Sequence, residues 1–400
     1  MSTISVIIPT FNRRAFLLEA IASILAQTRS VDQIIIWDDG SEDGTEDAVA
    51  QIEDRRVQYF AATNAGKSAA LNRAMQHATG DYIWICDDDD VLVEDAAETL
   101  AGVLDTEASI GIVGGSYTRF SDGRDGRQRT GPGYWPDLSA GPPLRHLLED
   151  IFLFQNAMLV RRSCYDRVGP FREDLHRSID YDMIVRLATR FPVHMVEKQV
   201  FLQRKHDGLR GPAAQRHAAS HVENVWAKQD AEVFLGLRTH VPLSLLRAMY
   251  DGNPETVSRA ACLQRGAAYA RHGLWDEAMS DFEAGVEAAP ETPLAETELS
   301  ICRRAVSGKH GVTPPPEALA RLSLLRRGSV AGRDLAGGLG RGLLWSIRRA
   351  ASERDLRETL RLLGLLRRTG LRLQSASGGA REVGPSLRER SQIPAAAYDW

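Results

Sequence analysis

The sequence predicts an α/β fold in its first half and an all-α region in its second half. Short apolar runs rich in isoleucine, valine and aromatic residues alternate with segments of helical periodicity up to about residue 92. From about residue 217 onward, helical periodicity predominates. Alternating strands and helices are typical of a doubly wound sheet, and a change to helices alone indicates a further domain. Four hundred residues also exceed one typical hydrophobic core.

The elements of the first half follow one another in a regular order. Buried strands are expected over residues 4–10, 33–37, 57–60 and 80–86, and helices over residues 14–27, 46–52 and 68–78. In such a sheet, ligands bind beyond the carboxyl ends of the strands. Thr10 and Phe11 follow the first strand, and Asp38 and Asp39 end the second. These side chains therefore cluster where the fold places a ligand. A further stretch, residues 121–141, is expected to be a mobile loop over the site.

The fourth strand ends in four consecutive aspartates, Asp87–Asp90. Because side chains alternate along an extended chain, Asp87 and Asp89 point to one face and Asp88 to the other. Paired carboxylates at the end of a buried strand form an oxygen-ligand site for Mg²⁺ or Mn²⁺. Considered alone, the run is better explained as a solvated acidic turn. The polar residues at the other strand ends favour the metal site.

Several other classes of protein are excluded by missing patterns. The chain has no glycine-rich dinucleotide fingerprint and no Walker A motif. A receiver domain would place its acidic pair after the first strand, and not after the second. Four scattered cysteines without a CxxC pair fit a reducing compartment and no thiolate zinc site. With no signal-peptide pattern and no apolar run of membrane-spanning length, we expect a cytoplasmic location.

Four motifs in order resemble the family 2 glycosyltransferases with a GT-A fold. They are found at residues 6–13, 36–45, 64–72 and 80–90. The resemblance covers about residues 3–210 and implies a mixed sheet flanked by helices over residues 1–215. It also implies an inverting, metal-dependent transfer of a sugar from a nucleotide-diphosphate donor, a UDP-sugar, to a glycan or lipid-linked acceptor.

The resemblance assigns donor-binding residues. Pro9, Thr10 and Phe11 would line the base, with Phe11 in place of the family's usual tyrosine, and Asp39 would accept a hydrogen bond from the base. A structural alternative is an Asx turn or helix cap made by Asp38 or Asp39. Lys67 would approach the diphosphate or be merely solvated. Asn72 would also face the donor, or else be a polar residue of its helix.

The resemblance also assigns the metal ligands. Asp87 and Asp89 match the family's DxD pair, so Mn²⁺ or Mg²⁺ would bridge them to the donor diphosphate. Asp90 matches the acid that often follows. Asp87 and Asp88 are also counted with the donor-binding residues, but Asp88 stands where a small residue is usual, so its role there is open. His206 matches a histidine that contacts the metal or the diphosphate in many relatives, the alternative being an exposed loop histidine.

The acceptor side of the resemblance lies near residue 180. By position, Asp180 matches the general base that takes the proton of the acceptor hydroxyl. Because Ile179 replaces the usual glutamate, Asp182 is a rival. A purely structural role for either carboxylate at a helix N-terminus is the alternative.

The second half is divided into two regions, residues 216–310 and residues 317–400. In the first, the spacing of Gly266, Tyr269, Ala278, Phe282 and Pro290 resembles one tetratricopeptide-like hairpin over about residues 259–292. It is either a groove for a protein partner or a structural appendix. The alternative to an enzyme is accordingly a non-catalytic interaction protein that uses this repeat on a transferase-like scaffold.

The last hundred residues carry 19 Lys and Arg against 8 Asp and Glu, a net charge of +11. A basic amphipathic helix is expected over residues 343–373. Such a helix can lie on the anionic inner face of a membrane, or it can pack on the preceding helices with its arginines in solvent. With few aromatic residues in this region, nucleic acid is not an expected partner.

Overall fold

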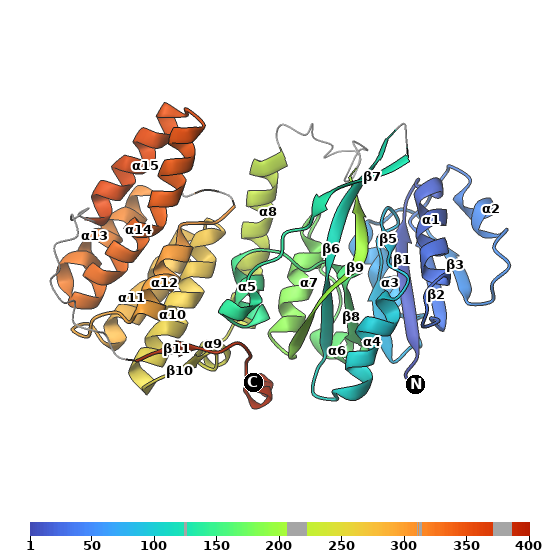
Figure 1. The fold of residues 1–400 in the computed structure, drawn as a ribbon, viewed down its shortest axis with the longest axis horizontal. Coiled ribbons are helices and arrows are strands. Elements are labelled where there is room, and N and C mark those ends of the chain that lie inside the picture. The colour runs from blue at the N-terminus through green and yellow to red at the C-terminus, as the bar shows by residue number, and fades with distance from the viewer. Residues whose placement is uncertain (124–125, 206–221, 310, 312–313, 371–385) are drawn as a thin grey trace. The chain divides into compact units, whose positions relative to one another are not determined.

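The structure is a computed structural model that describes residues 1–123, 126–205, 222–309, 311, 314–370 and 386–400 (Figure 1). The described residues belong to two compact units. The first comprises Met1–Asp137 and Ile151–Ala219, with Asp399, and the second comprises Leu138–Asp150 and Ser220–Tyr398, with Trp400. The expected domain limits at residues 215, 216–310 and 317–400 stay predictions.

The first unit is built on a mixed sheet, in which the described residues form nine strands. Their order is β3-β2-β1-β4-β8-β6-β9-β5, with β7 paired to β6. The strands are β1 (Ile4–Thr10), β2 (Gln33–Asp38), β3 (Val57–Ala61), β4 (Tyr82–Ile85), β5 (Val91–Leu92), β6 (Ile112–Gly123), β7 (Gly126–Pro132), β8 (Met158–Arg161) and β9 (Val193–Arg204). The first four strands are mutually parallel, and β8 then joins β4 in antiparallel orientation. The predicted α/β class is confirmed.

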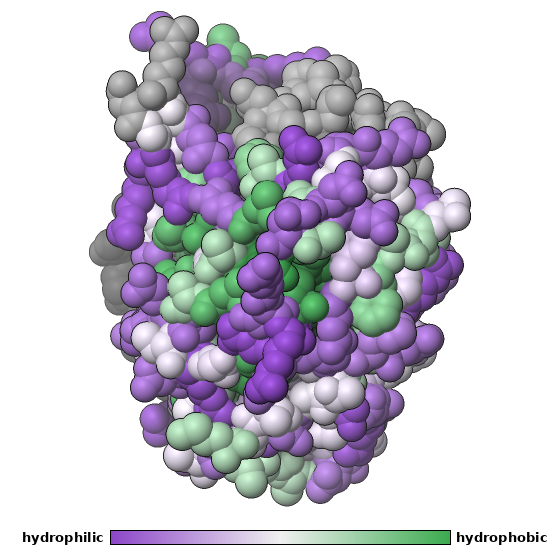
Figure 2. Space-filling view, turned by 90° about the vertical axis from the view of Figure 1, so that its right-hand side faces the viewer, coloured by the Kyte–Doolittle hydropathy of each residue, from purple (hydrophilic) through white to green (hydrophobic). Residues whose placement is uncertain are grey.

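Helices flank this sheet. They are α1 (Arg14–Leu25), α2 (Thr45–Val49), α3 (Lys67–Met75), α4 (Ala96–Thr106), α6 (Arg162–Val168) and α7 (Ile179–Ala188). Every residue of β1, β2 and β4 is buried, as expected for central strands covered on both faces. On the side of α1, α2 and β3, the surface is mostly hydrophilic, and hydrophobic residues gather around its middle (Figure 2).

The expectation of a loop over residues 121–141 is wrong for its first part. β6 continues to Gly123 and pairs in antiparallel register with β7. β7 consists of polar residues, glycines and a proline, and both of its faces are largely exposed, so its sequence shows no apolar alternation. Backbone pairing with β6 is enough to form β7, although neither side-chain face of β7 is buried.

The parallel strands bring their carboxyl ends to one edge of the sheet. Thr10 pairs with Asp38 at the ends of β1 and β2, and β4 ends directly before the four aspartates. Gly40 follows with φ +88°, and a Cβ atom there would lie 3.2 Å from the backbone nitrogen of Asn64. Only glycine takes this conformation and this close approach without strain. The loops after β2 and β3 can therefore lie against one another at the site.

The second unit is helical in its described part, apart from a two-stranded pairing of β10 (Tyr250–Asp251) with β11 (Arg388–Glu389). Its helices are α5 (Pro143–Glu149), α8 (Val222–Leu237), α9 (Leu243–Arg247), α10 (Pro254–Arg271), α11 (Trp275–Ala288), α12 (Glu296–Ala305), α13 (Pro316–Gly328), α14 (Val330–Ser352) and α15 (Leu356–Thr369). α10 and α11 form the expected helical hairpin. A Cβ atom at Gly266 would lie 2.6 Å from the Phe282 ring, so the glycine permits close packing of the two helices.

The predicted continuous helix over residues 343–373 is wrong. α14 ends at Ser352, and Arg354 has φ +59°, which a continuing α-helix cannot accommodate. Asp355 then caps α15 by accepting a hydrogen bond from the Glu358 backbone nitrogen. Arginines and leucines recur with helical periodicity in both α14 and α15, so the sequence pattern does not show the break between these helices. None of the described helices combines the length and apolar character needed to cross a bilayer.

Candidate active site

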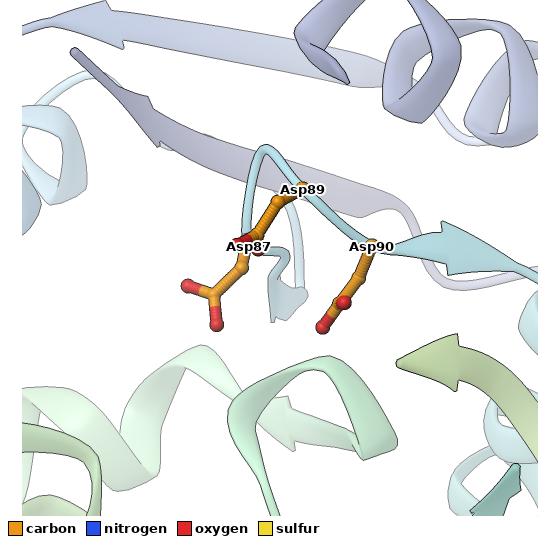
Figure 3. Close-up of side chains that lie close together, drawn as sticks. All are labelled: Asp87, Asp89 and Asp90. Carbon is orange, nitrogen blue, oxygen red and sulfur yellow. The ribbon is translucent and has the colours of Figure 1, made fainter. Parts of the chain in front are cut away.

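The four aspartates lie on the loop between β4 and β5. Carboxylate oxygens of Asp87, Asp89 and Asp90 lie within 4.8 Å of one another. Figure 3 shows the side chains of Asp87 and Asp90 directed to the same side of this loop. A cluster with only carboxylate oxygens as donors fits a hard divalent cation such as Mg²⁺ or Mn²⁺. The expected pair is therefore joined by Asp90 as a third candidate ligand.

Asp87 contacts a cation of the protein itself. The Lys67 ammonium at the start of α3 makes an ion pair with the Asp87 carboxylate. The Asp87 backbone nitrogen donates to the side-chain oxygen of Asn156, at 3.0 Å. Asp87 is thus fixed through its backbone, while its carboxylate faces Lys67.

Asp88 points into the interior and is 4% exposed. Its carboxylate accepts a 2.7 Å hydrogen bond from the Thr10 hydroxyl and a 2.9 Å hydrogen bond from the Arg13 guanidinium. Burial raises the pKa of Asp88 to about 6, and Arg13 opposes this shift by favouring the charged form. Arg13 and Thr10 therefore explain how a fourth carboxylate is accommodated in this loop.

Asp89 shares the same arginine. Its carboxylate lies 3.0 Å from the Arg13 guanidinium, and its carbonyl oxygen accepts a 2.8 Å hydrogen bond from Arg204 Nε. Arg13 precedes the first residue of α1 and so brings one positive charge from the first loop to two adjacent aspartates.

Asp90 is held on both carboxylate oxygens. One accepts a 2.6 Å hydrogen bond from Asn156 Nδ2, and the other accepts a 2.8 Å hydrogen bond from the Arg204 backbone nitrogen. The Arg204 side chain is 2% exposed, forms ion pairs with Glu19 and Asp122, and lies against two rings, those of Phe16 and Phe120. The loop therefore rests on a buried arginine that is itself paired with two carboxylates.

Asp180 lies at the start of α7, after Ser178, which has φ +53°. Burial raises the pKa of Asp180, and the Lys67 ammonium acts in the opposite direction. Desolvation alone would lower the pKa of Lys67, but Asp87 and Asp180 together raise it. Lys67 thus interacts with one carboxylate of the aspartate loop and one at the start of α7, which are far apart in the sequence.

Asp182 has a different environment. It is 2% exposed, and its carboxylate lies 2.8 Å from Arg186 Nε and 3.6 Å from the Arg172 guanidinium. A buried carboxylate held between two arginines is a structural ion pair.

The nucleotide side of the predicted site includes one exposed ring. Pro9 and Thr10 are buried at the end of β1, whereas Phe11 is 42% exposed. The Asp39 carboxylate accepts backbone hydrogen bonds from Ala65 and Gly66, at 2.9 and 2.8 Å. It therefore fixes the turn that precedes Lys67.

Asp38 makes the Asx-type contact that was expected of one of the two aspartates. Its carboxylate accepts from the Ser41 backbone nitrogen at 2.7 Å and from the Tyr59 hydroxyl at 2.6 Å. Because burial and Asp38 raise the pKa of Tyr59, that phenol stays protonated and donates.

Asn72 binds the acceptor-side segment. Its amide nitrogen donates to the Phe171 carbonyl at 3.0 Å and to the Glu173 carboxylate at 2.9 Å, and its amide oxygen accepts from the Phe171 backbone nitrogen. These contacts connect α3 to the turn before α7. His206 lies outside the described residues.

Sequence reasoning missed the roles of Arg13, Asn156 and Arg204. Arg13 belongs to the first motif, so its place in the first loop was a usable signal. Asn156 lies 66 residues from Asp90 on a short 3₁₀ turn, and no local pattern marked it. Arg204 ends a strand and resembles an ordinary polar residue at a strand end.

Known proteins are similar to the first part of the chain. A family model described as "Glycosyl transferase family 2" matches residues 5–169. GalNAc(5)-diNAcBac-PP-undecaprenol beta-1,3-glucosyltransferase of Campylobacter jejuni is 38% identical over 104 residues, which are 25% of this chain and 34% of that protein. An uncharacterized glycosyltransferase of Rickettsia felis is 28% identical over 211 residues, 51% of this chain and 34% of that protein.

A third relative is chondroitin synthase of Escherichia coli, 26% identical over 197 residues, which are 49% of this chain and 28% of that protein. The chain thus spans about a third of the length of these curated relatives.

A solved structure shares the fold. The crystal structure of S. aureus TarS 1-349 in complex with UDP-GlcNAc covers 93% of this chain, with 93% of its own length matched, a TM-score of 0.51 and 13% identity. At this identity the likeness concerns the fold alone, and together with the mixed sheet it confirms the expected GT-A architecture. Residues 5–169 of this chain therefore match the family that its four sequence motifs resemble, the family 2 glycosyltransferases.

Proposed function

We propose that the chain is an inverting glycosyltransferase that moves a sugar from a nucleoside diphosphate donor, a UDP-sugar, to a hydroxyl group of a glycan or lipid-linked acceptor. The observation that carries this proposal is the position of Lys67. It makes an ion pair with Asp87 and interacts electrostatically with Asp180. The candidate site for the leaving diphosphate and the candidate general base therefore both lie near Lys67, as a direct displacement requires.

The donor nucleotide has plausible contacts at the ends of β1 and β2. The exposed Phe11 ring offers a surface on which a base can stack. Asp39 is nearby on the adjacent strand end, and its two backbone hydrogen bonds fix its orientation. Each carboxylate oxygen retains an unused lone pair, so Asp39 can still accept a hydrogen bond from the base.

The diphosphate has its contacts at the aspartate loop. Asp87 and Asp89, with Asp90 beside them, would hold Mn²⁺ or Mg²⁺. When bound, such an ion neutralises charge that develops on the departing diphosphate. Lys67 and Arg13 add two cations of the protein at the same loop, and both would stabilise the same negative charge.

Asp180 is the proposed general base, and Asp182 is not. Asp182 is committed to a buried ion pair with Arg186, whereas the hydrogen bond of the Asp180 side chain is to the backbone nitrogen of Tyr181. Burial raises the pKa of Asp180, which makes its carboxylate a better proton acceptor than an ordinary surface aspartate. Attack by the deprotonated hydroxyl on the face opposite the diphosphate inverts the anomeric centre.

The acceptor class rests on the names of the relatives. One is a glucosyltransferase whose name specifies an undecaprenol-linked glycan, and another is a chondroitin synthase. Both names point to the hydroxyl of a growing glycan.

A panel of nucleotide sugars incubated with the whole chain and Mn²⁺ or Mg²⁺ tests the proposal, with release of free nucleoside diphosphate as the readout. We expect turnover with at least one UDP-sugar and loss of turnover on addition of EDTA. Asp89→Asn should abolish turnover, and Asp180→Asn should reduce it while UDP binding, measured by calorimetry, is retained. UDP binding with unchanged turnover in both variants would contradict the proposal. Absence of nucleotide binding in the wild type would favour the alternative of a non-catalytic interaction protein.

A further inference from the structure

α15 has two apolar faces. Leu362, Leu365 and Leu366 are buried within the second unit. Leu356, Leu360 and Leu363 are 74%, 69% and 39% exposed. The exposed leucines are four and three positions apart, so they form one stripe along the helix. Within the described residues, this stripe faces solvent.

Arginines border the leucine stripe. At 100° per residue, Arg357, Arg361 and Arg368 lie together on one side of it, and Arg367 lies within it. Arg361 makes an ion pair with Glu358. In the part of the chain that the structure describes, Arg357, Arg367 and Arg368 have no acidic partner. Three guanidinium groups beside exposed leucines are therefore available to an anionic surface.

The preceding helix adds an aromatic residue. Trp345 on α14 is 60% exposed, and the guanidinium of Arg349 lies over its ring at 5.4 Å. α14 and α15 are consecutive helices that lie side by side (Figure 1). Tryptophan is favoured at the boundary between water and lipid because its ring is amphipathic.

Positive charge is concentrated in this part of the chain. Residues 316–369 contain 12 arginines and 5 acidic residues, a net charge of +7. Because the whole chain has a net charge of −4, the remaining residues carry −11. The exposed leucines therefore lie in a strongly basic helical region of an otherwise acidic chain.

We propose that the hairpin of α14 and α15 docks on the surface of an anionic phospholipid bilayer. The leucine stripe enters the boundary between headgroups and acyl chains, and the neighbouring arginines contact lipid phosphates. Combined apolar and basic contacts bind peripheral helices more strongly than either kind alone. A second copy of the chain is a poorer occupant of this surface, because the two regions of net charge +7 would repel each other. The proposal does not depend on the proposed transferase activity.

Sedimentation of the whole chain with vesicles tests the proposal. One set of vesicles contains phosphatidylcholine alone, and the other contains phosphatidylcholine with phosphatidylglycerol. We expect sedimentation with the second set at low ionic strength and its loss as salt is raised, because salt screens the arginines. Sedimentation that is equal with both sets would overturn the proposed role of charge.

Two variants separate the contributions of the leucines and the arginines. Leu356→Gln/Leu360→Gln/Leu363→Gln should abolish sedimentation. Arg357→Gln/Arg368→Gln should weaken binding roughly fivefold for each arginine removed. Leu235→Gln is the matched control, because Leu235 is 54% exposed on α8 and has Glu232 one turn before it. This control should sediment as the wild type does.

Folding and self-association are checked on the same samples. All five substituted positions are exposed, so circular dichroism and the thermal midpoint should match those of the wild type. Light scattering without lipid reports the oligomeric state. If the triple leucine variant sedimented like the wild type, or if the stripe mediated a dimer that this variant dissolved, the membrane proposal would be wrong.

Discussion

Arg13 lies 2.9 Å from a carboxylate oxygen of Asp88, which is 75 positions further along the chain. The same guanidinium reaches Asp89 at 3.0 Å, so one positive charge serves two adjacent carboxylates. Asp88 is the member of the run that the resemblance left without a role. Its contacts with Arg13 and Thr10 assign it to the support of the loop, and leave Asp87, Asp89 and Asp90 as the group that can face a metal ion.

This relationship predicts a non-additive pair of substitutions. Arg13→Gln should lower the free energy of unfolding by roughly 2–4 kcal/mol, because it leaves the buried Asp88 carboxylate without its cation. Asp88→Asn should cost less, because Arg13 keeps Asp89 as a partner. The double variant should lose less than the sum, with a coupling on the order of 1–3 kcal/mol. Urea unfolding of the four proteins measures the coupling. Strictly additive losses would mean that the contact does not contribute to stability.

Asp180 and Asp182 should separate catalysis from stability. Asp182→Asn breaks a buried ion pair and should cost about 3 kcal/mol, seen as a thermal midpoint lowered by several degrees. Asp180→Asn replaces a carboxylate whose pKa burial raises, so a neutral amide should leave the midpoint unchanged.

For turnover, the order of the two effects should be reversed, with the larger loss in the Asp180 variant. Asp180→Asn should reduce it by about 10²–10⁴-fold. The folded fraction of Asp182→Asn should retain activity at a temperature well below its midpoint. If Asp182→Asn lost turnover while remaining folded and Asp180→Asn did not, the roles would be exchanged.

Asn156 is predicted to matter although no motif contains it. Asn156→Ala removes the hydrogen bond of the Asp87 backbone nitrogen and the hydrogen bond to one oxygen of the Asp90 carboxylate, whose other oxygen keeps its bond from Arg204. We expect a loss of roughly 2–4 kcal/mol in stability and weaker Mn²⁺ binding, since the loop loses its fixed geometry. Unfolding and calorimetric titration with Mn²⁺ measure the two effects. Gln76→Ala, an exposed polar substitution on the surface, should change neither.

His272 predicts a pH dependence for the second unit. Its ring is 3% exposed and stacks on Phe234 with a centroid distance of 3.6 Å, and its Nε2 lies 3.1 Å from the Leu148 carbonyl oxygen. Burial lowers the pKa of His272 to about 3. Since the unfolded chain has a histidine pKa of about 6.5, it binds more protons than the folded chain between these values. Stability should therefore fall as the pH is lowered through this window.

The slope attributable to one histidine approaches 1.4 kcal/mol per pH unit. His272→Gln should remove that slope, so the difference in unfolding free energy between variant and wild type should shrink from pH 7 to pH 5. This range avoids Glu149, whose pKa is lowered to about 2, against the effect of its burial, by Arg304 and Arg145. If the unfolding free energies of the wild type and the variant changed in parallel with pH, protonation of His272 would not destabilise the folded chain, and the prediction would be wrong.

The amino-acid sequence sufficed to predict the succession of strands and helices up to about residue 92 and the position of the acidic residues at one edge of the sheet. Apolar runs of the right length specify buried strands, and parallel strands place their carboxyl ends together whatever the rest of the chain does. The four motifs then sufficed to predict the family. The tetratricopeptide-like spacing around Gly266 likewise predicted a helical hairpin, because close packing of two helices needs a small residue at a fixed position.

Which carboxylates are committed to other contacts depends on the folded structure. In the sequence, Asp180 matches the general base by position and Asp182, two residues later, remains a rival. The structure distinguishes them, because Arg186 and Arg172 surround Asp182. Asn156 and Arg204 reach Asp90 across 66 and 114 positions. Contacts of this separation leave no periodic trace in the sequence, because hydrogen bonds between single side chains depend on the folded geometry of both partners.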